Sequence, residues 1–82
     1  MDRLERKTNL FYNEYVPEVR AQIDELREAG HDVSELERIL ASLEEAVQKK
    51  DYLNADFLIE MLIETLSSAR DDAGFGRTDF FL

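Results

Sequence analysis

The chain has 82 residues, enough for one domain, since single domains mostly run from about 50 to 250 residues. This length excludes a two-domain enzyme. Apolar residues make up 44% and charged residues 35% of the chain, which is too apolar for a disordered chain and too polar for a bilayer-spanning one. Because there is no cysteine, disulfides, thiolate zinc sites and thiol catalysis are excluded.

The charge balance argues against several kinds of partner. Nineteen acidic residues against ten basic ones give −9 at pH 7, which repels phosphate backbones and anionic lipid headgroups. Residues 1–7 carry charges where a secretion signal needs an apolar stretch, and no uncharged run approaches the about 20 residues of a membrane span. We expect a cytoplasmic protein with no direct contact to nucleic acid or membrane.

The first predicted helix covers residues 2–29. Its apolar residues recur at helical spacing and project onto one face, and this phase is kept across Pro17. One long, kinked helix is therefore favoured. Since proline removes a hydrogen bond and pushes Val16 away from helical geometry, a break at residues 15–17 is the alternative, with Asn13 able to cap a restarted helix.

Stop and start signals separate the next two helices. Gly30 suits the residue that ends a helix, and the pairs Asp32 with Glu35 and Ser34 with Glu37 match capping-box spacing at the start of a second helix over residues 33–49. Residues 49–55, Lys-Lys-Asp-Tyr-Leu-Asn-Ala, place an N-cap aspartate after two cations. This segment resembles the corner of tetratricopeptide-type hairpins, and the resemblance implies an antiparallel helical hairpin.

The third predicted helix, residues 52–70, is the most apolar. Its apolar residues project over more than half of the helix circumference, so two other helices of the same chain cannot cover them all. We expect a homodimer or an obligate partner to cover the remainder. The flank that this partner covers would hold either Phe57 and Met61 or Tyr52, Ile59 and Ile63.

The polar strip of this helix is acidic. Asp56, Glu60 and Glu64 recur every four residues without a cation within a turn until Arg70, so they repel one another slightly. A solvated face that keeps an apolar helix soluble is one interpretation. A strip that docks a basic partner is the other.

The last residues, 72–82, form an acidic and aromatic tail. Gly74 and Gly76 interrupt any helix, and the apolar residues of the tail are expected to pack on the bundle or on a partner: Phe75, Phe80, Phe81 and Leu82. Residues 78–82, Thr-Asp-Phe-Phe-Leu, resemble the aromatic end of a sliding-clamp-binding peptide. Arg77 and Gly74 stand where that family has its aliphatic plug and its glutamine.

The sequence offers little for catalysis or metal binding. Glu28 and His31 have the Glu-x-x-His spacing of carboxylate di-iron bundles, but Gly30 interrupts the helix between them. No serine has a visible base partner, and no glycine lies in a phosphate-binding loop. We therefore expect no enzyme activity, no cofactor, no metal and no small-molecule substrate.

The sequence as a whole predicts an all-α protein. Residues 1–71 are expected to form one three-helix bundle, with a long first helix packed on a helical hairpin, followed by the tail. The expected function is a small acidic interaction or regulatory module, a homodimer that docks through the third helix and the tail. Two alternatives are an acidic mimic that occupies a basic site of a nucleic-acid-binding protein and a client of a replication sliding clamp.

Overall fold

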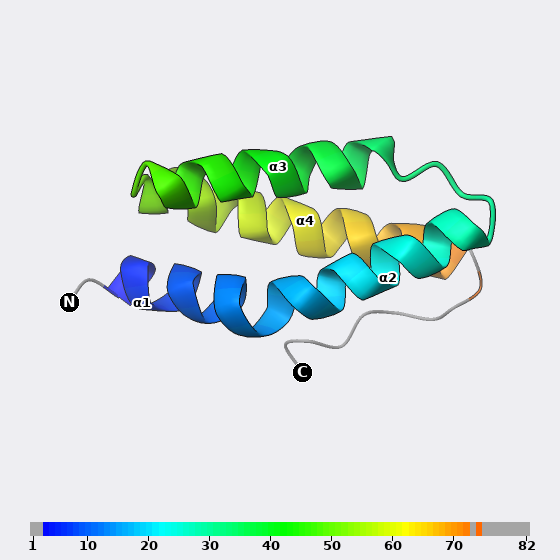
Figure 1. The fold of residues 1–82 in the computed structure, drawn as a ribbon, viewed down its shortest axis with the longest axis horizontal. Helices are drawn as coiled ribbons and strands as arrows, with labels where there is room; N and C mark the ends of the chain where they lie inside the picture. The colour runs from blue at the N-terminus through cyan, green and yellow to red at the C-terminus, as the bar shows by residue number, and fades with distance from the viewer. Residues whose placement is uncertain (1–2, 73, 75–82) are drawn as a thin grey trace.

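A computed structural model describes residues 3–72 and residue 74. The described residues form helices joined by short connections and contain no strand, and the helices form three rods packed side by side (Figure 1). The first rod joins three segments end to end, and each of the other two rods is one helix. In chain order the elements are α1 (Arg3–Leu10), the π-helical turn η1 (Phe11–Tyr15), α2 (Val16–Glu28), α3 (Ser34–Gln48) and α4 (Tyr52–Asp72). The predicted all-α three-helix bundle is confirmed.

The first rod runs through Pro17 without a break. The backbone N–H of Val16 donates to the carbonyl of Phe11, five residues back, instead of the usual four. Pro17 has no N–H, and its ring would crowd the carbonyl four residues before it in a regular α-helix. The wider π turn absorbs one extra residue just before the proline, so the helix continues. The buried residues Phe11 and Val16 are accordingly five apart.

The connection from α2 to α3 ends one helix and starts the next. Gly30 has φ 89°, and the N–H groups of Gly30 and His31 donate to the carbonyls of Arg27 and Leu26, which is the Schellman ending. Neither predicted capping box forms. Instead, a carboxylate oxygen of Asp32 accepts from both the backbone N–H and the hydroxyl of Ser34, at 3.0 and 2.7 Å.

The turn from α3 to α4 has the same backbone pattern with a lysine in place of the glycine. Lys50 has φ 60°, and the N–H groups of Lys50 and Asp51 donate to the carbonyls of Val47 and Ala46. A side-chain oxygen of Asp51 then accepts from the N–H of Asn54 at 3.4 Å, the N-cap role that the sequence predicts. The result is the expected antiparallel hairpin of α3 and α4 (Figure 1).

The core centres on α4, which packs against α3 on one side and against α1 and α2 on the other. Aliphatic side chains from every rod fill this core, and α1 adds one polar residue, Thr8, which is 0% exposed. Within the described residues, no helix combines the length and the apolar character needed to cross a membrane.

Candidate functional site

The outer face of α4 is the side of this helix that no other helix covers. We define it by Leu53, Phe57, Glu60 and Glu64, all exposed, with the half-buried Met61 at its edge. Leu53 is 75% exposed and Phe57 62% exposed, and they lie four residues apart, so they are neighbours on one helix face. Large apolar side chains that are next to one another and exposed are typical of a surface that binds another molecule.

The opposite flank of α4 packs against the first rod and is therefore largely covered. Ile59 is 1% exposed and belongs to the core, while Ile63 and Tyr52 are half-buried. Of the two flanks that the sequence left open, the structure exposes Phe57 on one and buries Ile59 on the other, while Met61 is half-buried like Tyr52 and Ile63. Ile59 belongs to the core and supports the fold.

A shallow groove of about 280 Å³ lies between α1 and α4. Ile59 and Ile63 form its apolar floor, and Lys7, Glu60 and Glu64 form its rim. Glu60 and Glu64 thus border both this groove and the exposed Phe57. The groove is large enough for one apolar side chain beside charged groups of either sign.

The predicted acidic strip is shorter than expected. The Lys7 ammonium lies 2.6 Å from a carboxylate oxygen of Asp56, so Asp56 pairs with a cation that the sequence places 49 positions earlier. The helix itself holds no cation within a turn of the strip, so the partner of Asp56 comes from α1. Glu60 and Glu64 have no ion pair among the described residues, so they remain as an acidic border of the outer face.

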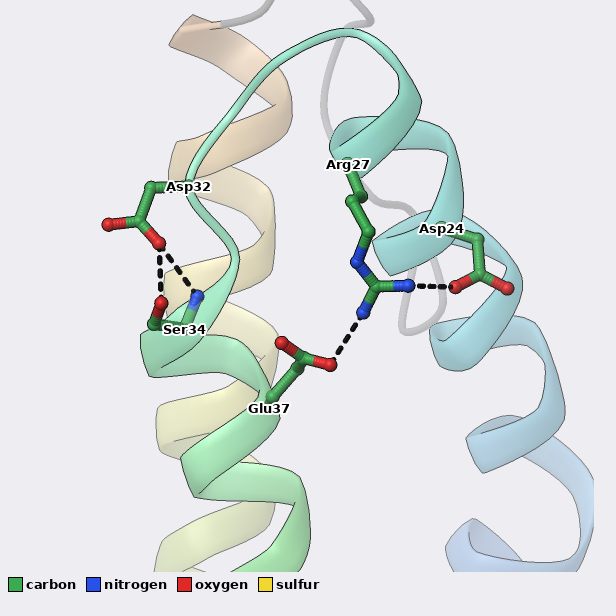
Figure 2. A network of polar contacts seen from close by, with 5 residues as sticks. All are labelled: Asp24, Arg27, Asp32, Ser34 and Glu37. Atoms are coloured by element: carbon green, nitrogen blue, oxygen red, sulfur yellow. Dashed lines mark hydrogen bonds and ion pairs between the residues drawn. The ribbon is translucent and has the colours of Figure 1, made fainter.

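A second hollow of about 320 Å³ lies between α2 and α3, and ion pairs bridge it. The Arg27 guanidinium contacts Glu37 across the hollow at 2.5 Å and Asp24 on its own helix at 3.0 Å (Figure 2). Arg20 pairs with Glu44 further along the same two helices. These contacts hold α2 beside α3, which gives this hollow a structural role.

Four shifted pKa values mark local contacts at the ends of the helices, and one of them is the pKa of Lys49, which its hydrogen bond with Glu45 raises. Hydrogen bonds from the Ser34 hydroxyl and N–H lower the pKa of Asp32, and the Lys49 ammonium lowers the pKa of Glu45 through a hydrogen bond and its charge. Partial removal from water and the nearby Glu5 carboxylate raise the pKa of Tyr52. None of these groups lines the outer face of α4, so the shifts describe contacts at helix ends.

The described residues hold no group of three or more histidine, aspartate or glutamate side chains placed to bind a metal ion. His31 and Glu28 are both exposed at the α2–α3 connection, on either side of Gly30. The docking residues predicted in the tail, Phe75, Phe80, Phe81 and Leu82, lie outside the described residues.

Three residues that matter here were not singled out from the sequence. Leu53 is the most exposed large apolar residue of α4, and its spacing of four from Phe57 is the signal that would have found it. Lys7 pairs with Asp56, and Thr8 is buried with a hydroxyl that has no hydrogen-bond partner among residues 3–72. No pattern within one helix reveals either of the latter two, because both depend on how α1 packs on the bundle.

The described surface offers one face suited to binding another molecule. Its strongest feature is an apolar pair, Leu53 and Phe57, beside two carboxylates that lack an ion pair among the described residues. Comparison with protein-family models, with curated proteins and with solved structures gives no match to this chain.

Proposed function

We propose that this chain is a small, acidic, non-catalytic interaction module that docks a protein partner through the outer face of α4. The observation that carries the proposal is the exposure of Leu53 and Phe57, at 75% and 62%, on the helix that also supplies much of the core. Burying such a pair against a partner contributes roughly 1.5–3 kcal/mol per side chain. Aromatic side chains are also among the commonest anchors of protein interfaces.

Other parts of the surface support this choice by comparison. Among the described residues, three large apolar side chains are exposed, and two of them share this face; the third, Leu10, lies on α1. The hollow between α2 and α3 is already bridged by ion pairs. The outer face of α4 is thus the described surface with the most apolar area left to bury.

The carboxylates beside Phe57 add a preference for partner charge. Glu60 and Glu64 border the apolar pair and have no cation of their own within ion-pair distance in the described chain. A partner that presents an apolar pocket next to lysine or arginine would gain from them in association rate and in specificity. Apolar burial provides affinity, and the carboxylates select the partner.

A capture experiment with the full chain tests the proposal. The Phe57→Asp variant should lose the partner, while Ala21→Asp, which adds the same charge at an exposed position on α2, should keep it. Binding should also survive about 0.5 M salt, because apolar contacts are not screened. Unchanged binding by Phe57→Asp would refute this function.

The same experiment separates the two alternatives. An acidic mimic would lose its partner at modest salt and in a variant with Glu60 and Glu64 changed to glutamine, whatever stands at residue 57. A sliding-clamp client would lose its partner when the chain is truncated after Asp72. Either pattern, combined with normal binding by Phe57→Asp, would favour that alternative.

A further inference from the structure

We propose that the partner of the outer face of α4 is a second copy of this chain, with the two α4 helices antiparallel about a two-fold axis at Phe57. This inference rests on the proposed docking function and names its occupant. Symmetric pairs with one self-complementary patch are the commonest assemblies of soluble proteins. The question is therefore whether this face complements itself, in shape and in charge.

The apolar residues of the face are symmetric about Phe57. Leu53 precedes it by four residues and Met61 follows it by four, so the three form one row along the helix. In an antiparallel pair about Phe57, each residue meets the one equally far on the other side. Phe57 then packs on its own copy, and Leu53 packs on Met61 of the second copy. The two most exposed residues of α4 are both covered.

One charge on the face, Glu64, and one charge at its end, Lys50, are of opposite sign and lie equally far from Phe57 along the sequence. Glu64 follows Phe57 by seven residues, and Lys50, at the turn into α4, precedes it by seven. The same two-fold axis brings Glu64 of each copy to the Lys50 end of the other. Neither side chain has an ion pair within the described part of its own chain, and the neighbouring Lys49 is already paired with Glu45 at 2.7 Å. Each copy thus supplies one cation and one anion that the other lacks.

Charge also selects the direction of pairing. In a parallel pair, the glutamates at 60 and 64 of one copy would face those of the other, and like charges across an interface are unfavourable. The antiparallel pair separates these carboxylates. In the antiparallel pair, the groove between α1 and α4 lies beside the interface, so no side chain of the second copy has to fill it.

The size of the patch implies a weak dimer. One helix face buries less than the about 1,200–2,000 Å² of a standard stable interface. Each copy also carries −9, which opposes association at low salt. We expect dissociation at micromolar concentrations, and tighter association as salt screens the net charge up to about physiological strength.

Sedimentation equilibrium of the full chain tests the dimer. The wild-type protein should shift from monomer to dimer as its concentration rises, and Phe57→Asp should weaken association at least tenfold while Ala21→Asp leaves it unchanged. Lys50→Glu and Glu64→Lys should each weaken it several-fold, and the combined variant should restore it. A monomer at every concentration, or a combined variant weaker than either single one, would overturn the proposal. Circular dichroism of each variant shows whether it remains folded.

Spin labels test the direction of pairing, and the absence of native cysteine makes single labels simple. With the axis at Phe57 and about 1.5 Å per residue, labels at Ser68→Cys lie about 33 Å apart along the helix and labels at Asp71→Cys about 42 Å. A parallel pair would give the same short separation at both positions, which would contradict the proposed arrangement.

The outcome also separates this inference from the proposed function. A strictly monomeric chain whose foreign partner is lost in Phe57→Asp would refute the second copy as occupant and leave the docking function intact. A chain that neither self-associates nor loses any partner on this substitution would refute both.

Discussion

The two flanks of α4 are packed in different ways. The ion pairs of α4, Lys7 with Asp56 and Glu25 with Arg70, both reach the first rod, where Thr8 is also buried. On the side toward α3, a tight turn joins the two helices, and buried leucines and isoleucines of both helices pack together. The hairpin is therefore held by apolar burial, while the first rod is positioned in part by charges and tolerates a buried polar atom.

The largest expected effect tests the apolar core of the hairpin. Leu62 is 0% exposed, so Leu62→Ala leaves a cavity and should lower the free energy of unfolding by about 2–5 kcal/mol. Urea denaturation at constant pH measures it. A loss below about 1 kcal/mol would mean that the hairpin collapses around the cavity and that its packing is less tight than described.

A second, opposite effect is expected on the side of the first rod. The Thr8 hydroxyl is buried without a hydrogen-bond partner, and valine has nearly the same shape without that polar atom. Thr8→Val should therefore raise the free energy of unfolding by about 1–3 kcal/mol. Thr65→Val, at a half-buried position on α4, is the control and should change little. A destabilised Thr8→Val protein would show that the hydroxyl has a partner after all, such as a bound water.

A smaller effect is expected from the ion pair of Lys7 with Asp56. Both side chains are partly exposed, at 45% and 27%, so a double-mutant cycle with Lys7→Met and Asp56→Asn should give a coupling of about 0.2–1 kcal/mol. The coupling should fall as salt rises. A cycle with no coupling at low salt would mean that charge does not help to position α1 on α4.

The smallest effect concerns the connection that joins α2 to α3. Hydrogen bonds from Ser34 lower the pKa of Asp32 in the folded chain from its usual 3.8, so its contribution is present at neutral pH and is lost as pH falls below that range. The stability difference between wild type and Asp32→Ala should therefore shrink on acidification. Urea titrations at about pH 7 and about pH 2.5 measure it, and a constant difference would assign the effect to something other than this carboxylate.

The helices and their ends could be predicted because their signals are local. Gly30 ends α2, Asp51 caps α4, and both act within one turn of their own position. Pro17 left two outcomes open because proline disfavours a helix locally, whereas the π turn that rescues it depends on how the neighbouring carbonyls are shared.

The site was only half predictable because it depends on helix packing. The apolar arc of α4 is wide enough to suggest two exposed flanks, and only the position of α1 decides that Ile59 is buried and Phe57 is not. In the same way, the pairing of Asp56 with Lys7 depends on the register between helices at opposite ends of the sequence. Periodicity within one helix carries no information about that register.

The central place of α4 has a consequence for how the chain is made. Because α4 lies between the first rod and α3, those two have little apolar surface to share until it is present. The first fifty residues of the chain contain the first rod and α3, but they lack the helix against which both of these pack. We therefore expect the nascent chain to form its core only after α4 has emerged.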